Sequence, residues 1–122
     1  MATDNLGKCI SLKAGADFSA KQYRFAVVSA PNTAAVAGEG VPVVGVIQDN
    51  PISGATTAIA IDGVSKVKVG ANPVVAGALA KSDANGLADT AASGDDGVGI
   101  FLTSGAAGET VEVALVKSGL RA

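Results

Sequence analysis

Apolar residues along this chain recur in short runs with a period of two, and Gly, Pro, Asn and Asp separate the runs. Val111, Val113 and Leu115, for example, alternate with polar or small neighbours, which is the pattern of a strand with one buried face. No segment shows a long apolar period of 3.6 that is uninterrupted by Gly or Pro, so the pattern predicts an all-β protein. The predicted strands are residues 23–29, 41–48, 56–62, 65–70, 78–82, 98–103 and 110–117.

Two features of this pattern make sharper predictions. The sequence VPVVGVIQ at 41–48 does not alternate, so we expect it to be covered on both faces, by the chain itself or by a neighbouring subunit. Asn85 and Gly86 predict a tight hairpin with a type I′ turn, which needs a positive φ at both positions.

The chain also contains an internal repeat with an offset of 54 residues. VVGVIQDNPISGATTAIAIDG at 43–63 is matched by GVGIFLTSGAAGETVEVALVK at 97–117, and a weaker similarity begins at Gly15 and Gly70. Two copies are too few for a solenoid, so we expect one small compact β-sandwich or β-barrel-like body. Its two similar strand-turn-strand halves are predicted at about residues 15–69 and 70–122.

Composition limits what such a body can bind. The length of 122 residues suits one domain, and Val, Ile, Leu and Ala must fill the core because 48% of the residues are hydrophobic but only 3% aromatic. The net charge is −2 and the nine basic residues are scattered singly along the chain. Neither nucleic acid nor a membrane is therefore an expected partner. The apolar excess has to be covered, and an interface with other subunits is one place where it can be.

The N-terminal sequence and the cysteine content bear on the compartment. Cys9 is the only cysteine, so no intramolecular disulfide can form and folding needs no oxidising environment. The first residues lack the apolar run of a secretory signal, and no run approaches the roughly 18 apolar residues of a membrane helix. We therefore expect synthesis in the cytoplasm.

The residue types offer little for catalysis or metal binding. Histidine is absent, which removes the commonest general base and the usual serine triad. One cysteine without histidine cannot form a structural zinc site, and Cys9 has no imidazole to activate it. Asp83, Asn85 and Asp89 do not have the spacing of an EF-hand loop. We predict no catalytic residue, cofactor, metal or small-molecule substrate.

Two short segments nevertheless resemble motifs of the trimeric dUTP pyrophosphatases. AGADFSA at 14–20 is similar to their first motif, and GVIQD at 45–49 is similar to the start of their Gly-Val-Ile-Asp motif. Where that family has an acid this chain has Gln48, which cannot act as a base toward water. The family's stacking tyrosine and its phosphate motif are missing. A trimeric enzyme of this kind stays an alternative function, which a nucleotide hydrolysis assay would test.

A broader resemblance covers almost the whole chain. GKCISLKAGADFSAKQYRFAVVS, GVIQDNPISGATTAIAIDGVSKV and GVGIFLTSGAAGETVEVALV resemble, in order and spacing, the capsid cement or head decoration proteins of tailed bacteriophages. The C-terminal segment VGIFLTSGAAGETVEVALVKSGLRA is similar to the lambda-type head decoration proteins. The resemblance implies an all-β homotrimer that is made in the host cytoplasm and stands on the outer capsid surface of the virion. There it would bind the major capsid protein and stabilise contacts between neighbouring copies.

The resemblance also implies which residues make these contacts. Lambda-type proteins use an extended N-terminal arm, which corresponds here to residues 1–12, before a single β domain at 13–122. An arm of this kind can add a strand to the exposed sheet edge of a partner. The capsid contacts are then predicted at Asp4, Asn5, Leu6, Lys8, Ile10 and Leu12, and the trimer interface at Val41, Val43 and Val44.

Two alternatives remain at this stage. The segment KCISL at 8–12 could instead be the first strand of the body. The protein could also be a surface carbohydrate-binding or fibre module, although sugar sites use exposed aromatic side chains. The sequence offers only Phe18, Tyr23, Phe25 and Phe101.

Overall fold

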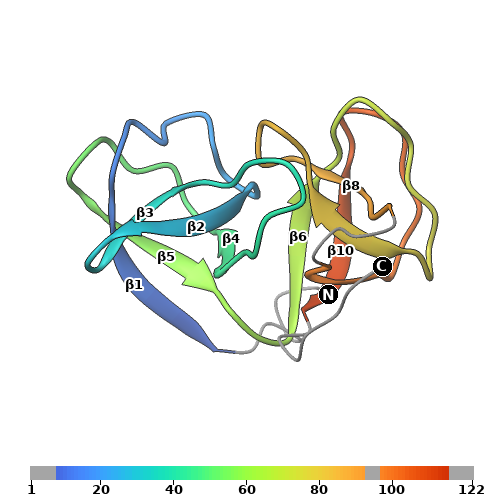
Figure 1. The fold of residues 1–122 in the computed structure, drawn as a ribbon, viewed down its shortest axis with the longest axis horizontal. Helices are drawn as coiled ribbons and strands as arrows, with labels where there is room; N and C mark the ends of the chain where they lie inside the picture. The colour runs from blue at the N-terminus through green and yellow to red at the C-terminus, as the bar shows by residue number, and fades with distance from the viewer. Residues whose placement is uncertain (1–7, 93–96, 116–122) are drawn as a thin grey trace.

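The computed structural model describes residues 8–92 and 97–115. Within these residues the chain forms ten strands and no helix, which confirms the predicted all-β class. Figure 1 shows two lobes side by side, with the N-terminal strands in one lobe and the C-terminal strands in the other. The strands are β1 (Cys9–Ala14), β2 (Phe25–Ala30), β3 (Thr33–Val36), β4 (Gly45–Ile47), β5 (Thr56–Ala60), β6 (Val64–Lys68), β7 (Leu79–Ser82), β8 (Ala88–Thr90), β9 (Gly99–Phe101) and β10 (Thr110–Leu115).

Each predicted segment overlaps one observed strand, but the prediction lacks β1, β3 and β8. The strands β3 and β8 have the sequences TAAV and ADT, which are too short and too poor in large apolar residues to show an alternation. The strand β1 is the first strand of the body, because its residues 9–13 pair with β5. The predicted arm of residues 1–12 is therefore wrong for residues 9–12.

The strands form two sheets of five strands each. In the first sheet the order β1-β3-β2-β4-β5 closes on itself to form a barrel, because β1 also pairs with β5. In the second sheet the order is β6-β10-β9-β7-β8. A single parallel bridge between Val69 and Ala88 connects its two edges. The first unit is thus a closed barrel, and the second is nearly closed.

The two sheets are copies of one another down to the register of their strands. The pairs Val46↔Ala60 and Ile47↔Ile59 between β4 and β5 recur 54 residues later between β9 and β10 as Ile100↔Ala114 and Phe101↔Val113. The pairing of β2 with β3 recurs as the pairing of β7 with β8 at the same offset. The pairing of β1 with β5 recurs as that of β6 with β10. Strands β1 to β5 therefore correspond in order to β6 to β10.

This correspondence places the boundary between the halves earlier than the sequence predicts. The predicted halves begin at Gly15 and Gly70, where the visible similarity begins, but each unit starts one strand earlier, with β1 and β6. The sequences of these strands, CISLKA and VSKVK, show little likeness, which is why the sequence comparison missed them. We call residues 9–60 the first repeat and residues 64–115 the second repeat.

Two hydrophobic cores lie inside this arrangement. One fills the first barrel and includes Phe18, Ile47 and Ile59. The other fills the second repeat and also takes in side chains from the outer surface of the first, namely Phe25, Val46 and Ala60. The strand β4 is buried throughout, with Val46 in one core and Ile47 in the other. The expectation that residues 41–48 are covered on both faces is confirmed for β4, which the chain itself covers, whereas Pro42 is exposed.

The turn at Asn85 and Gly86 differs from its prediction. Only Gly86 has a positive φ, of 77°, so the turn is not type I′. The Asp83 carboxylate accepts hydrogen bonds from the backbone N of Asn85 at 2.8 Å and of Leu87 at 2.9 Å. A carboxylate that caps a longer loop between β7 and β8 thus replaces the tight two-residue turn.

Candidate interaction surfaces

The contact between the two repeats, which we call the joint, is made by an inserted piece of backbone. The O of Tyr23 accepts from the N of Lys68 at 3.0 Å, and the N of Phe25 donates to the O of Gly86 at 2.7 Å. Tyr23 to Phe25 therefore lies between β6 and the loop that joins β7 to β8. In the first repeat the corresponding groups bond each other directly, because the N of Lys13 donates to the O of Asn32 at 2.8 Å. The second repeat is open where the first is closed, and the first repeat fills the opening.

Side chains reinforce the joint. Phe25, Val46 and Ala60 are fully buried against the second repeat. Lys81, which is 8% exposed, forms an ion pair with Glu39. The two repeats are therefore held by apolar packing, backbone hydrogen bonds and an ion pair between a buried lysine and an exposed glutamate.

Gln48 and Arg24 also connect the repeats. The Gln48 Nε2 donates to Ser65 Oγ at 2.9 Å, and the Arg24 Nη1 donates to the Asn85 O at 3.0 Å. These bonds fix the orientation of two polar side chains that the sequence alone does not place at an interface.

The correspondence between the repeats identifies the surface of the second repeat that is equivalent to the joint surface of the first. The residues that correspond to the buried Phe25, Val46 and Ala60 are Leu79, Ile100 and Ala114, and all three are only half-buried. Beside them Leu102, which corresponds to Gln48, is 45% exposed. We call these four residues, Leu79, Ile100, Leu102 and Ala114, the second-repeat end. Among the described residues nothing covers it in the way that the second repeat covers the first.

The free side of the first repeat shows the matching feature. Ser82 of the second repeat is fully buried, and its O accepts from the N of Gly40 across the joint at 2.9 Å. The corresponding residue of the first repeat is Val28 in β2, which is 52% exposed. We call the surface around Val28 the first-repeat end. Two of the large hydrophobic side chains that remain exposed, Val28 and Leu102, thus mark the two free ends of the tandem.

The structure places the predicted interface valines close to the cores. Val41, Val43 and Val44 lie between β3 and β4 and are half-buried. Val41 and Val43 pack against the core that the two repeats share, and Val44 packs against the core of the first barrel. Most of their apolar surface is thus covered within the chain, and their role in a trimer stays a prediction.

The predicted capsid contacts differ in whether the structure describes them and in how exposed they are. Asp4, Asn5 and Leu6 lie outside the described residues. Lys8 is exposed directly before β1, Ile10 is half-buried in β1, and Leu12 is part of the first core. Leu12 is therefore wrong as an exposed anchor, because its side chain already stabilises the barrel.

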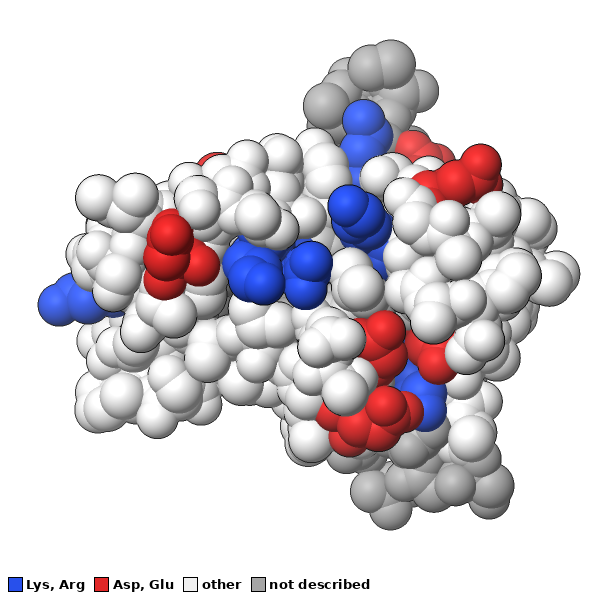
Figure 2. All heavy atoms as spheres, turned by 90° about the horizontal axis from the view of Figure 1, so that it is seen from above, with Lys and Arg blue, Asp and Glu red and all other residues white. Residues whose placement is uncertain are grey.

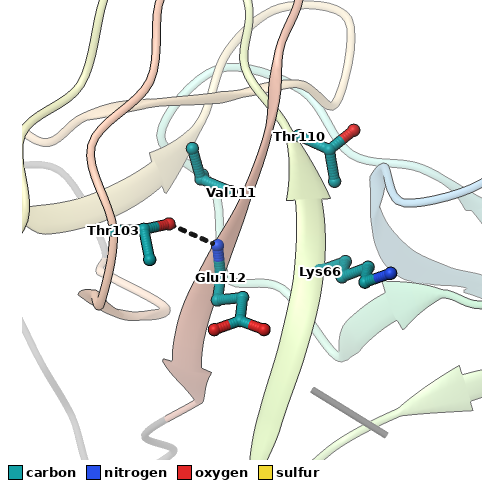
Figure 3. Close-up of a pocket in the computed structure, with 5 residues that line it drawn as sticks. All are labelled: Lys66, Thr103, Thr110, Val111 and Glu112. Atoms are coloured by element: carbon teal, nitrogen blue, oxygen red, sulfur yellow. Dashed lines mark hydrogen bonds between the residues drawn. The ribbon is translucent and has the colours of Figure 1, made fainter. Parts of the chain in front are cut away.

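A polar groove lies on the outer surface of β6 and β10. It has a volume of about 310 Å³ and is lined by Lys66, Thr103, Thr110, Val111 and Glu112. Figure 3 shows Thr110, Val111 and Glu112 along β10, with Lys66 on the neighbouring β6. The backbone N of Glu112 donates to Thr103 Oγ1 at 3.1 Å. No aromatic side chain lines this groove, so it lacks the flat apolar surface on which sugars stack.

The aromatic residues are placed as core and joint residues. Phe18, Phe25 and Phe101 are buried, and Tyr23 is half-buried with a positive φ of 67°. The residues that carried the resemblance to dUTP pyrophosphatases are also engaged in structural bonds. Gln48 bonds to Ser65, and the Asp49 carboxylate accepts from Thr57 Oγ1 at 2.5 Å.

The described part of the chain holds no group of three or more potential metal-ligating side chains. It also has no helix that is long and apolar enough to cross a membrane.

Comparisons with known proteins give a likeness to a solved structure. Neither a scan against protein families nor a search of curated proteins finds a match. Among solved structures, the N base of the head fibre gp8.5 of bacteriophage phi29 matches with a TM-score of 0.74 and 15% sequence identity. The chain has the fold of that fibre base. The match covers 94% of this chain and 98% of the phi29 chain, so the likeness to the phi29 fibre base extends over both repeats.

Proposed function

We propose that this protein is a structural component of a bacteriophage head that binds the outer surface of the shell and stabilises contacts between major capsid proteins. The likeness of fold to the phi29 fibre base, over nearly the full length of both chains, is the observation that carries this proposal. The motif resemblance to capsid decoration proteins points to the same place in the virion. The core and the joint hold the aromatic side chains and several polar side chains in structural contacts. This suits a rigid protein that acts by binding a surface.

A second candidate is the base of a head fibre, which the name of the phi29 protein favours. Loss of the protein distinguishes the two roles. Heads that lack a decoration protein should break at a lower temperature than complete heads, because the protein stabilises neighbouring capsid subunits. Heads that lack only a fibre base should break at the same temperature.

We further propose that the protein acts as a homotrimer in which the second-repeat end of one chain contacts the first-repeat end of the next. The joint within one chain is the template for this contact. It connects two units of one fold through unlike surfaces, and a contact of this head-to-tail type forms a ring if the rotation between units closes. Figure 1 shows β6 turned with respect to β1 in the plane of the picture, so the units are rotated and not merely shifted. Three chains would place six similar repeats around one axis.

The contact between chains cannot be an exact copy of the joint. In the joint, Tyr23 to Phe25 enters an opening between β6 and the following loop. In the first repeat this opening is closed by the bond between Lys13 and Asn32. Apolar contact between Leu102 and Ile100 on one chain and Val28 on the next therefore has to supply most of the attachment.

Co-sedimentation of the purified protein with expanded heads of the phage that encodes it tests the binding. The protein should sediment with the heads and saturate at a fixed number of copies per head. Failure to bind heads at any protein concentration would contradict the proposed function.

Light scattering tests the oligomer. The expected mass is about 35 kDa, which is three times the 11.8 kDa of one chain. A protein that is monomeric both in solution and on the heads would contradict the trimer.

A further inference from the structure

The joint brings together basic residues that are far apart in the sequence. The hydrogen bond from the N of Lys68 to the O of Tyr23 places β6 beside the segment that contains Arg24. A bond from the N of Arg24 to the O of Lys21 at 3.2 Å folds Lys21 into the same turn. Lys66 lies two residues from Lys68 in β6, and both are exposed, so their side chains leave the same face of the strand. We call Lys21, Arg24, Lys66 and Lys68 the basic row.

Figure 2 shows basic side chains gathered in a row across the middle of this face, between the two lobes. The only ion pair within the described residues joins Lys81 to Glu39, so no member of the row is neutralised by a bonded carboxylate there. The whole chain has a net charge of −2. The row is therefore a local concentration of positive charge on an otherwise slightly acidic protein.

Arg24 adds a second observation. A guanidinium group has five N–H donors in a fixed plane. The structure shows one side-chain bond from Arg24, in which Nη1 donates to Asn85 O at 3.0 Å. Its Nε is buried without a hydrogen-bond partner among the described residues. Because Nε is buried, an external carboxylate could bond only to the outer Nη groups of this half-buried side chain.

We propose that the basic row binds a short acidic segment of a protein partner, and, given the proposed function, that this partner is the capsid shell protein. The four cationic side chains of the row can pair with a short segment that carries a few carboxylates. The row does not match a long polyanion, because acidic side chains flank it in Figure 2. Glu112 is also the Cα partner of Lys66 across β6 and β10. A nucleic acid that extended beyond the row would meet this negative charge.

The row sits on a rigid support, which favours binding. Lys68 is held by a backbone bond across the joint, and Lys66 belongs to a strand that pairs with β10 over five residues. Little backbone ordering is needed when a partner arrives. In a trimer three such rows would act together, so weak single contacts would add to a firm attachment.

A matched pair of variants tests the inference. The test variant is Lys66→Gln with Lys68→Gln. The control is Lys13→Glu, which lowers the net charge by the same two units at one exposed position. Lys13 is the first-repeat counterpart of Lys68, since both pair with the first residue of the partner strand. Both variants should melt at the wild-type temperature because all three side chains are exposed.

Binding is measured to immobilised poly-L-glutamate, to duplex DNA and to expanded heads, each over a range of salt concentrations. Wild-type protein should bind poly-L-glutamate more tightly than DNA, and binding should weaken as salt rises. The test variant should bind both poly-L-glutamate and heads about tenfold more weakly, which corresponds to two surface ion pairs. The control should stay within about twofold of wild type on the same scale.

The outcomes separate this inference from the proposed function. If wild type binds heads and both variants bind them equally well, the basic row is not the contact and the proposed function stands. If the protein binds poly-L-glutamate through the row but never binds heads, the acidic-partner inference holds and the proposed function fails. Tighter binding to DNA through the same lysines, or no effect of the test variant on any ligand, would overturn the inference.

Discussion

At the residue scale, the glycines that repeat in the sequence also repeat in the structure for a steric reason. A Cβ on Gly45 would lie 2.2 Å from the O of Ala60, and a Cβ on Gly99 would lie 2.0 Å from the O of Ala114. Both distances are far below van der Waals contact, and the atoms they would strike belong to the backbone of a paired strand. The offset of 54 residues between these glycines is visible in the sequence, and it reflects the same steric constraint in both repeats.

Gly45→Ala and Gly99→Ala should each lower the free energy of unfolding by about 2–3 kcal/mol, because the paired backbone must move to admit the methyl group. Gly38→Ala is the control, since its Cβ would meet nothing within 4 Å, and it should be neutral to within about 0.5 kcal/mol. Urea denaturation monitored by circular dichroism measures all three. Equal stability of the Gly45 and Gly38 variants would contradict the close approach of β4 and β5.

Backbone conformation provides a second residue-scale test. Gly77 has a φ of 90° and open space around it, so Gly77→Ala should cost about 1 kcal/mol through the left-handed conformation alone. Its counterpart in the first repeat is Tyr23, with a φ of 67°. The sequence gives no hint of a positive φ at a tyrosine, but Gly77 has a positive φ at the same place in the second repeat, so the fold of each repeat requires this conformation. A denaturation midpoint unchanged by Gly77→Ala would contradict this geometry.

At the element scale, the sequence predicts the hairpins β4–β5 and β9–β10 well because both copies keep their glycines and their alternation. It does not predict that β1 corresponds to β6 or that β3 corresponds to β8. The reason is that β3 and β8 are short and filled by small and polar residues, while β1 and β6 share little sequence likeness. Pairing with other strands fixes the positions of β1 and β3. The joint is likewise invisible in the sequence, since Lys68 and Tyr23 meet only after both repeats have formed.

The joint makes corresponding residues of the two repeats unequal. Phe25 is fully buried in it, whereas Leu79 is half-buried at the second-repeat end. Phe25→Ala should therefore lower the free energy of unfolding by about 3–5 kcal/mol. Leu79→Ala should lower the free energy of unfolding of the monomer by only about 1 kcal/mol. Chemical denaturation at low protein concentration measures the free energy of unfolding of both variants. Equal losses of stability would contradict the predicted contribution of the joint.

At the scale of the whole molecule, two units share one core, and their free ends carry exposed apolar side chains. Composition predicted an apolar excess, and the structure shows where part of it lies. The valines at 41, 43 and 44 were expected to form the trimer interface, but packing against the chain's own cores covers most of their surface. Val28 and Leu102 remain as the exposed alternatives, and only the comparison of the repeats identifies them.

Val28→Asp and Leu102→Asp should each prevent trimer formation and leave the fold intact, because the new charges stay in water on the monomer but would be buried between chains. Ile52→Asp is the control, since Ile52 is exposed at 68% in the loop between β4 and β5 and is not one of the residues that define the two ends. Size-exclusion chromatography with light scattering should give a monomer for the first two variants and a trimer for the control. Trimers of all three would show that the chains meet through other surfaces.

A cryo-electron microscopy reconstruction of the bacteriophage heads to which the protein is proposed to bind tests the central claim most directly. We predict density on the outer surface of the shell that is fitted by three copies of the chain around one axis. In that density the Leu102 end of each copy meets the Val28 end of the next, and the basic rows face acidic residues of the shell. A shell without such density, or copies that meet through surfaces away from both ends, would contradict the account.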